Sequence, residues 1–192
     1  MAKVLFIQAN YDIDKVGKLT PWMPVALVEL ATFIREKGNH KVKILDRNLD
    51  YDNEKFIKTL KEFKPDVVGM TCYTSSMIRD VKQVAQITKQ NSNAMVLIGG
   101  IHATLRPKTL LDKPYIDHIV RGEGEHALLE ICELIDKGKA TEENISKIKN
   151  VDFSVMRELF DLREMPVPDY ELLEIKKYPL ATFYTSRGCP GK

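Results

Sequence analysis

The sequence of 192 residues has little cysteine and no long hydrophobic run. Its three cysteines, Cys72, Cys132 and Cys189, are widely spaced. An odd, sparse set without an export signal argues against a disulfide-stapled secreted domain. No apolar stretch approaches the ~20 residues that a membrane-spanning helix needs. The opening segment MAKVLFIQAN turns polar after a short apolar run, which predicts a buried strand and not a signal peptide. We therefore expect a cytoplasmic protein without a membrane span.

The sequence also lacks an excess of charge of one sign. It has 29 Lys and Arg residues against 27 Asp and Glu residues, a formal net charge of +2. This near balance gives no electrostatic reason to expect nucleic acid or an anionic membrane as a partner. Two nucleotide-binding motifs are missing as well. There is no Walker phosphate loop and no Gly-x-Gly-x-x-Gly after the first apolar run, which disfavours dinucleotide cofactors.

The sequence does contain an alternation of short apolar runs and longer amphipathic segments. The apolar runs predict strands at 3–9, 41–46, 66–72, 94–100 and 115–120, and the amphipathic segments predict helices at 24–38, 53–64, about 76–90, near 104–112 and 124–138. Strands that alternate with helices predict an α/β fold with a doubly wound, flavodoxin-like or Rossmann-like, five-stranded parallel sheet, for which we expect the strand order 2-1-3-4-5. Residues 1–138 are interpreted as this domain.

The composition changes after Gly138, and we expect a C-terminal extension there. Polar residues and prolines over 139–178 indicate a connecting segment, in which 147–155 and 158–166 are candidate strands of a small hairpin. The segment PLATFYTS (179–186) predicts a further strand. Since a lone strand has no partner within its own unit, we expect residues 179–192 to begin another domain of a longer parent protein.

The loops that follow the strands are the candidate functional sites, because sheets of this type bind ligands at the carboxyl ends of their strands. The first loop, 10–24, exceeds the usual ~2–6 residues, which suits either a functional loop or a surface loop with Trp22 packed over the sheet edge. The loop after the third strand, TCYTSSM (71–77), carries several hydroxyl groups. These suit either capping of the next helix or hydrogen bonds to a polar ligand.

The loops after the fourth and fifth strands contain paired or closely spaced glycines. GGIHAT (99–104) lets the backbone approach a ligand closely. Its His102 suits either a ligand contact or an ordinary polar side chain, because no second metal ligand stands at metal spacing beside it. RGEGEHA (121–127) offers free backbone N–H groups at a helix start. Its acidic side chains suit the helix dipole and argue against a bound phosphate.

Several segments together resemble one family, the cobalamin-binding domain at the N-terminus of cobalamin-dependent radical SAM enzymes. The subgroup named after anaerobic magnesium-protoporphyrin monomethyl ester cyclase is the most similar. Each motif is loose by itself, but their order and spacing match over essentially all 192 residues. The matching segments are LVELATFIREKGNHKVKILD (27–46), PDVVGMTCYTSS (65–76), IGGIHAT (98–104), RGEGE (121–125), MPVPDY (165–170) and TFYTSRGCP (182–190).

This resemblance implies that cobalamin lies over the carboxyl ends of the strands, with its nucleotide tail in a groove beside the sheet. Thr74, Ser75, Gly99 and Gly100 would line the tail, and RGEGE would lie at the corrin rim or the tail. The implied cobalamin-binding residues are Asn10, Thr71, Tyr73, Thr74, Ser75, Gly99, Gly100, His102, Gly122, Glu123, Gly124 and Glu125.

One departure from related cobalamin domains concerns the loop after the first strand. Some of these domains carry D-x-H-x-x-G there, and its His binds cobalt from below. In DIDKVGK (12–18), Asp14 stands where that His would fall, and no His occurs in the first 39 residues. The resemblance therefore implies a cobalt without an imidazole ligand from this loop.

The resemblance also gives Cys189 a role as the first of three cysteine ligands of a 4Fe–4S cluster that binds S-adenosylmethionine. The second ligand would fall at position 193, and one thiolate cannot hold such a cluster. We therefore expect the cluster, S-adenosylmethionine and the chain's own radical SAM barrel to act in a full-length parent, with the 192-residue chain inert by itself.

The expected function is that of a cobalamin-binding module of a radical SAM enzyme that catalyses methyl transfer or cyclisation. The alternative is the same fold with an empty cobalamin site, serving as a non-catalytic contact domain for a substrate or partner. A receiver domain is disfavoured, because such a domain needs an Asp after the third strand and the sequence there is TCYTSS.

Overall fold

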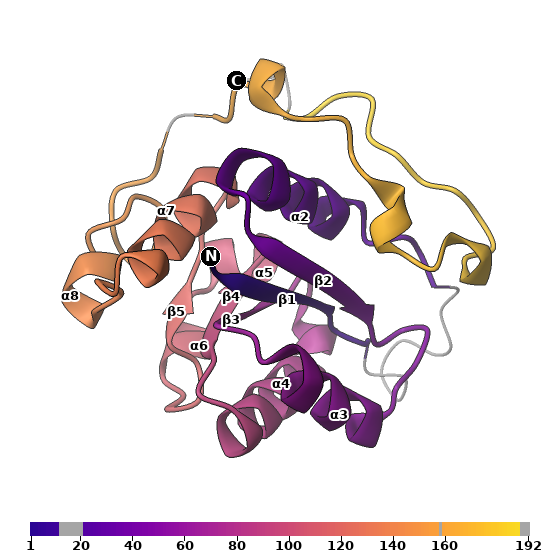
Figure 1. Ribbon diagram of the computed structural model, residues 1–192, viewed down its shortest axis with the longest axis horizontal. Coiled ribbons are helices and arrows are strands. Elements are labelled where there is room, and N and C mark those ends of the chain that lie inside the picture. Colours follow the sequence, from indigo (N-terminus) through magenta and orange to yellow (C-terminus); the bar gives the residue numbers. More distant parts are fainter. Residues whose placement is uncertain (12–20, 158, 189–192) are drawn as a thin grey trace.

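Five parallel strands form one sheet at the centre of the protein (Figure 1). The computed structural model describes residues 1–11, 21–157 and 159–188. The strand order is β2-β1-β3-β4-β5, which confirms the fold class and the order expected from the sequence. The strands are β1 (Lys3–Gln8), β2 (Lys41–Asp46), β3 (Val67–Thr71), β4 (Met95–Gly99) and β5 (His118–Ile119).

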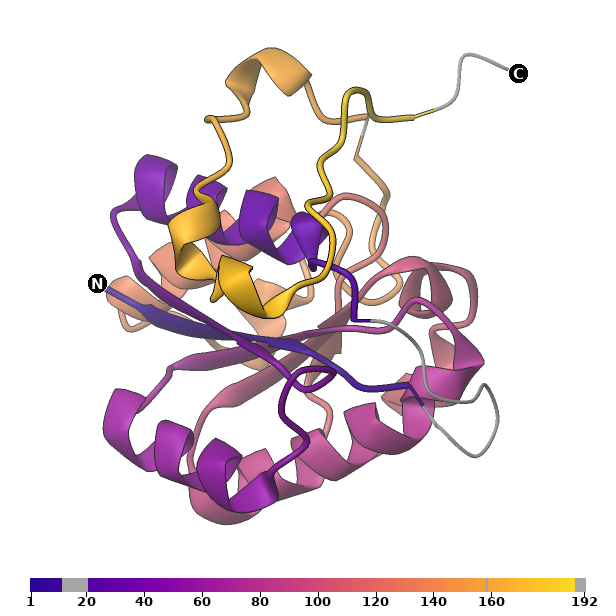
Figure 2. The ribbon, with the colours of Figure 1, turned by 90° about the vertical axis from the view of Figure 1, so that its right-hand side faces the viewer.

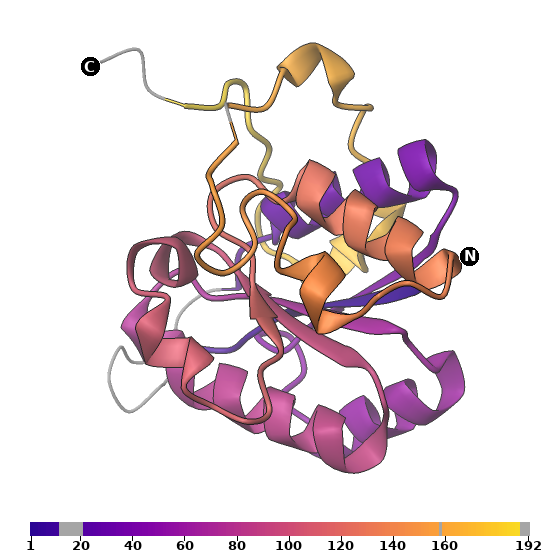
Figure 3. The same cartoon turned by 90° about the vertical axis from the view of Figure 1, so that its left-hand side faces the viewer.

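Helices cover both faces of the sheet (Figures 1 and 3). On one face lie α2 (Val25–Gly38), α7 (Glu125–Asp136) and the short α8 (Glu142–Ile145), and on the other lie α3 (Asn53–Phe63), α4 (Ile78–Asn91) and α6 (Lys108–Leu111). A 3₁₀ turn, Ser75–Met77, precedes α4, and α5 (Ile101–Leu105) follows β4 directly. Among the described residues, no helix combines the length and the apolar character needed to cross a bilayer.

The central strand β1 shows why the sequence produces this layered core. Its side chains alternate between the two faces, as in any strand. Leu5 and Ile7 pack in the core under α3 and α4, whereas Val4 and Phe6 pack in the core under α2 and α7. Because both faces are covered, the strand reads as a continuous apolar run. The same alternation puts Gln8, the last residue of β1, on the α2 side.

A buried ion pair fixes the carboxyl ends of β1 and β2 against α4. The Arg47 side chain is fully buried, and its Nε and Nη2 donate hydrogen bonds of 2.8–3.0 Å to the carboxylate of Asp80 on α4. Asp80 also accepts the backbone N–H of Asn10 at 2.7 Å, and the Arg47 backbone N–H donates to the Gln8 carbonyl at 3.0 Å. These bonds hold residues 8–10 in one position at the carboxyl edge.

The segment after α7 differs from the expected hairpin. In the described parts of 147–155 and 158–166, one isolated antiparallel bridge joins Val151 to Val120, and no hairpin forms. The reason is local, because Asn150 and Asp152 adopt left-handed conformations, with φ of 73° and 49°. The backbone here bonds to the end of β5 instead, with Asp152 N–H to Ile119 O at 2.8 Å (Figure 3).

The remaining C-terminal residues run along the α2 side of the molecule (Figure 2). They form 3₁₀ turns at Leu162–Glu164, Tyr170–Leu172 and Ile175–Lys177. The strand expected at 179–186 is not formed, since no neighbouring strand pairs with it in the described part of the chain. Nearer to α7 in the sequence, Ile145, Ile148 and Phe160 pack into the core under α2 and α7. The boundary at residue 138 stays a prediction.

Replacement of Asp80 by Ala should test the importance of the Arg47–Asp80 pair for stability. Removal of one partner leaves a buried guanidinium without its counter-charge, which costs about 3–5 kcal/mol. We expect Asp80→Ala to lower the free energy of unfolding by that amount in urea denaturation. The matched control is Asp112→Ala, at the exposed residue that follows α6. Equal effects of the two substitutions would contradict this role.

The pair of His118 and Asp152 should make stability depend on pH. Burial opposes protonation of His118, but its 2.7 Å contact with Asp152 outweighs burial, so the pKa of His118 is raised above its ordinary value of 6.5. The folded pKa thus exceeds the unfolded one, and the stabilisation is fully present below about pH 6.5 and is lost as the pH rises through the folded value. We expect wild type to exceed Asp152→Asn in unfolding free energy at pH 5.5 by more than at pH 8.5. A constant difference between the two proteins would exclude the linkage.

Candidate functional site

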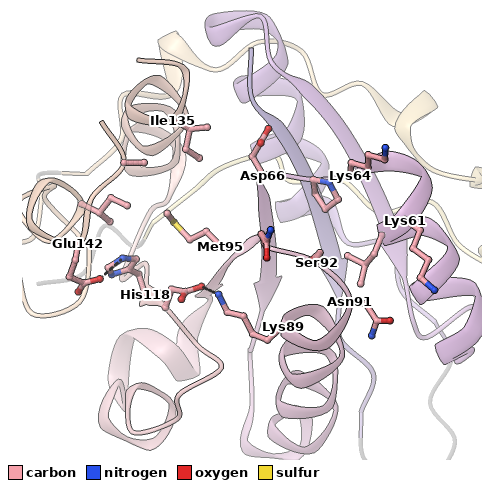
Figure 4. A pocket seen from close by; sticks show the side chains of 16 residues that line it. Lys61, Lys64, Asp66, Lys89, Asn91, Ser92, Met95, His118, Ile135 and Glu142 are labelled. Carbon is pink, nitrogen blue, oxygen red and sulfur yellow. Dashed lines mark hydrogen bonds and ion pairs between the residues drawn. The ribbon is translucent and has the colours of Figure 1, made fainter. Parts of the chain in front are cut away.

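A cleft of about 820 Å³ lies at the amino ends of the strands (Figure 4). Lys61 and Lys64 lie on one side of this cleft and His118 and Glu142 on the other. Two of its charged groups, Lys89 and Asp117, are paired with each other. Lys89 Nζ lies 2.5 Å from Asp117 Oδ2. Parallel sheets bind ligands at the opposite end of their strands. The size of this cleft therefore does not make it the best candidate.

One group beside the cleft has the composition of a metal site. His118, Glu142 and Asp152 bring potential ligand atoms within 4.8 Å of one another. However, both ring nitrogens of His118 already face carboxylates, with Nδ1 2.7 Å from Asp152 and Nε2 3.4 Å from Glu142. Glu142 is also exposed. We interpret these contacts as structural, because they hold the segment after α7 against the end of β5.

A second cavity of about 270 Å³, here named the sheet cavity, lies between the sheet and helices α2 and α7. Phe6, Gly69 and Leu97, from three neighbouring strands, lie on the sheet side, and apolar side chains of both helices lie opposite. The residues that line it are Phe6, Ala26, Leu27, Glu29, Leu30, Gly69, Met70, Thr71, Tyr73, Leu97, Gly99, Gly100, Val120, Gly122, Glu123, Gly124, Glu125, Leu128, Tyr184 and Arg187. The sheet cavity opens at the carboxyl ends of β3 and β4.

Glycines keep the sheet cavity open. A Cβ atom on Gly69 would lie 3.4 Å from the Phe6 ring, and one on Gly99 would lie 3.6 Å from the Val120 carbonyl oxygen. Larger side chains at these two positions would therefore extend into the space. Gly100 has φ of +96°, and a Cβ there would lie 2.8 Å from the Cys72 carbonyl oxygen, so this position requires glycine. Gly99 and Gly100 thus let the chain turn sharply from β4 into α5 beside the cavity.

The structure brings eight of the twelve residues expected from the sequence to the sheet cavity. These are Thr71, Tyr73, Gly99, Gly100, Gly122, Glu123, Gly124 and Glu125. They come from three loops that are far apart in sequence and meet because the carboxyl ends of parallel strands share one edge. Their contact with cobalamin stays a prediction.

The other four expected residues lie elsewhere. Thr74 bonds to the neighbouring Ser76 hydroxyl at 2.6 Å, and Ser75 begins the 3₁₀ turn before α4, so neither lines the cavity. His102 Nε2 lies 3.0 Å from Thr109 Oγ1, and burial together with Arg106 lowers the pKa of His102. Asn10 is held through its backbone by Asp80. Asp14 and Cys189 lie outside the described residues.

The two described cysteines have no reactive character. Cys72 and Cys132 are free and buried. Burial raises the pKa of each thiol to about 12. Both therefore remain protonated near neutral pH and pack as small apolar side chains.

An arginine at the mouth of the sheet cavity was not expected from the sequence. Arg187 Nη2 lies 2.6 Å from Glu29, and its Nη1 lies 2.6 Å from Glu125 and 3.7 Å from Glu123. Burial opposes its charge, but Glu125 and Glu29 outweigh burial and raise the pKa of Arg187. The sequence had singled out Glu123 and Glu125 within RGEGE and Arg187 within 182–190, and Glu29 stands as a charged residue between the apolar residues of the helix at 24–38, but nothing in the sequence joined them.

A third cavity of about 380 Å³, here named the edge cavity, adjoins the sheet cavity. The two cavities share Tyr73 and Tyr184 in their walls. The residues that line the edge cavity are Gln8, Tyr11, Pro21, Trp22, Met23, Pro24, Asn48, Tyr73, Thr182 and Tyr184. Aromatic rings and prolines dominate this wall, with two side-chain amides among them. The two cavities therefore form one continuous candidate site along the carboxyl edge.

Each cavity contains a buried oxygen without a hydrogen-bond partner in the described part of the chain. These atoms are Gln8 Oε1 in the edge cavity and Glu125 Oε2 in the sheet cavity. Buried polar atoms in native proteins almost always have partners. Both atoms are hydrogen-bond acceptors that lie beneath the accessible surface of the cavity walls.

The chain matches a known domain family and resembles several known proteins. The sequence profile of the B12 binding domain matches residues 14–132. An uncharacterized methyltransferase of Pyrococcus horikoshii is 37% identical over 190 residues, which cover 91% of this chain and 40% of that protein. Anaerobic magnesium-protoporphyrin IX monomethyl ester cyclase of Rubrivivax gelatinosus is 30% identical over 207 residues, which cover 98% of this chain and 37% of that protein.

A solved structure shares the fold. The cobalamin-dependent S-adenosylmethionine radical enzyme OxsB, with aqua-cobalamin and S-adenosylmethionine bound, superposes with a TM-score of 0.71 at 15% identity. The match covers 88% of this chain and 24% of that chain. The present chain thus spans between about a quarter and two fifths of these three proteins. The resemblance to the N-terminal domain of cobalamin-dependent radical SAM enzymes is confirmed.

The Arg187 cluster gives a stability prediction. Arg187→Ala would leave Glu29 and Glu125 buried without their cation, at a cost of about 2 kcal/mol for charge-assisted hydrogen bonds. We expect the free energy of unfolding in urea to fall by that amount. Arg163→Ala, which removes an exposed arginine paired with Asp161, is the control and should change it by less than about 1 kcal/mol. An unchanged stability of Arg187→Ala would contradict the cluster.

Proposed function

The chain belongs to the B12-binding domain family, and from this premise we propose that it binds cobalamin at the carboxyl ends of its strands. The nucleotide tail enters the sheet cavity, and the corrin ring lies over the edge cavity and the adjoining loops. The residues around the sheet cavity are the proposed contacts of the tail. When bound, cobalamin supplies a cobalt centre that can carry a methyl group.

The observation that supports this proposal most is that glycines line the sheet cavity on its sheet side, opposite α2. A planar ring needs two flat, apolar walls close together, and Gly69 and Gly99 leave room that side chains would fill. The opposite wall consists of apolar side chains of α2 and α7, including Leu30 and Leu128. Glu125, whose Oε1 lies 2.6 Å from Arg187, adds a carboxylate to the wall of this cavity.

The role of the whole parent protein is a further part of the proposal. The parent is a radical SAM enzyme that catalyses methyl transfer or cyclisation, and Cys189 is the first cluster ligand. Exposed apolar side chains along the C-terminal segment, among them Phe153, Leu159 and Phe183, support a following domain that covers them. Their exposed fractions are 61%, 83% and 68%, which is unusual for large apolar residues grouped in one segment.

A second candidate function is a contact domain with an empty cobalamin site. The position of Arg187 favours it, since the guanidinium lines the sheet cavity and pairs with Glu29 and Glu125 without any ligand. The two candidates differ in one measurement. Purified protein mixed with hydroxocobalamin and passed over a desalting column should retain stoichiometric corrin absorbance if the first holds. Complete loss of the absorbance, together with no heat of binding in calorimetry, would support the contact domain.

A substitution that fills part of the sheet cavity should test where the nucleotide tail binds. Gly99→Val places two methyl groups in the sheet cavity with no backbone strain, because Gly99 lies in a strand and its Cβ has ordinary contacts. We expect cobalamin affinity to fall at least about tenfold, in line with the cost of overpacking. Lys41→Val, on the exposed start of β2, introduces the same side chain outside the cavity and should leave the affinity unchanged. Wild-type affinity of Gly99→Val would place the tail elsewhere.

A further inference from the structure

The C-terminal residues 178–187, here named the strap, form part of the wall of both cavities. Thr182 lines the edge cavity, Arg187 lines the sheet cavity, and Tyr184 between them lines both. The strap passes the start of α2, where the Thr182 N–H lies 3.4 Å from Met23 Sδ (Figure 2). Because Arg187 lies at the mouth of the sheet cavity, the strap borders the path by which a ligand enters.

One end of the strap is fastened in a buried apolar cluster. Tyr178 is buried and packs with Met23 and Val25 at the start of α2. Its hydroxyl donates a 2.8 Å hydrogen bond to the carboxylate of Asp46 at the end of β2. Release of this end would expose the ring to water and leave a buried carboxylate without its donor, and both changes are unfavourable. We therefore take Tyr178 as the anchored end.

The other end of the strap is held by charge. Arg187 lies 2.6 Å from both Glu29 and Glu125 and 3.7 Å from Glu123, and its guanidinium lies 5.6 Å from the centre of the Phe160 ring. The arginine side chain is 22% exposed, so water already reaches it. Since Glu29 and Glu125 line a cavity, water can solvate them when the guanidinium leaves. This end can therefore be released without exposure of the core.

The stretch between the two ends is weakly held. Residues 179–186 are exposed except for Thr182, which is half-buried. Among the hydrogen bonds between described residues, only the one from Thr182 to Met23 involves this stretch. Segments with an exposed backbone and few internal contacts open at a low free-energy cost. Once Arg187 is released, little else holds the strap over the cavities.

We propose that the strap acts as a lid on the cobalamin site, with Tyr178 as its anchored end and Arg187 as its releasable end. The proposal rests on the proposed function, because the ligand that passes the lid is cobalamin. In the closed state Arg187 pairs with Glu29 and Glu125 at the mouth of the sheet cavity. In the open state these pairs are broken and the ligand enters or leaves. The open fraction of the protein then limits the rate of binding.

Stopped-flow mixing of the chain with hydroxocobalamin measures both rate constants. Trp22, the single tryptophan of the sequence, lines the edge cavity, so quenching of its fluorescence reports uptake. We expect Arg187→Ala to raise the association and the dissociation rate constants about tenfold each, since it removes charge-assisted hydrogen bonds that hold the lid closed. A residue that only contacted the bound ligand would change the dissociation rate constant alone.

Two further variants support this comparison. Glu29→Gln keeps the size of the side chain and removes one of the two anions, so it should raise both rate constants by a smaller factor. It also tests the lid if Arg187→Ala does not fold. Arg163→Ala is the matched control, because Arg163 is an exposed arginine of the same C-terminal region, paired with Asp161 and outside both cavities. It should leave both rate constants at the wild-type values.

Proteolysis of the corrinoid-free protein gives a readout that needs no ligand. Chymotrypsin cleaves after aromatic residues, and the strap contains Phe183 and Tyr184. A segment must open before a protease can bind it, so the cleavage rate follows the open fraction. We expect cleavage at these two positions to be severalfold faster in Arg187→Ala than in wild type and unchanged in Arg163→Ala. Bound cobalamin should slow it in the wild-type chain.

The outcomes separate this inference from the proposed function. Faster association in Arg187→Ala and Glu29→Gln, together with faster cleavage, supports both. Unchanged or slower association in both variants, while cobalamin still binds, overturns the lid and leaves the proposed function standing. Equal cleavage of the strap in wild type and Arg187→Ala also overturns the lid alone. Uptake by Arg187→Ala but not by wild type supports both, with a lid that stays closed. Failure of every protein to take up hydroxocobalamin overturns both.

Discussion

The buried pair of Arg47 and Asp80 is the constraint on which the geometry of the carboxyl edge depends. It joins the end of β2 to α4, and through Asp80 it also fixes the start of the loop after β1. A fully buried guanidinium is tolerated because a carboxylate on a neighbouring helix neutralises it. Its consequence for function is indirect. The pair holds the ends of β1 and β2, beside which the edge cavity lies, through hydrogen bonds to Asp80 and Arg47.

Two charged clusters differ in where they lie relative to the candidate site. Arg47 and Asp80 lie beneath the edge and stabilise it, whereas Arg187 with Glu29 and Glu125 lies at the mouth of the sheet cavity. The second cluster joins a C-terminal segment to helices α2 and α7, residues more than 60 positions apart in sequence. A ligand in the sheet cavity therefore meets two buried carboxylates that share a single arginine. The charge balance of the pocket depends on the position of the C-terminal segment.

The candidate site follows from the fold by one physical rule. Parallel strands bring their carboxyl ends to one edge, so loops that are distant in sequence converge there. This is why Thr71, Gly99 and Gly122 could be grouped from the sequence before any contact was known, and all three line the sheet cavity. The same rule does not predict whether the side chain of a residue in these loops points into the cavity. Thr74 and Ser75 follow β3 just as Thr71 does, but the 3₁₀ turn at Ser75–Met77 carries them away from the cavity.

The sequence by itself determined the five strands, the longer helices and the order of the sheet, because apolar periodicity and the rules of parallel crossovers are local or nearly local constraints. The helix expected near 104–112 is instead two short helices, Ile101–Leu105 and Lys108–Leu111. Contacts between distant side chains were decided by the tertiary structure alone. The hairpin expected after residue 146 gave way to hydrogen bonds with β5, since Asn150 and Asp152 adopt left-handed conformations. Gln8 stands in a strand predicted from its apolar residues, and only the folded chain revealed that its buried oxygen has no partner among the described residues. Such features depend on what lies opposite a residue in space, which no local pattern records.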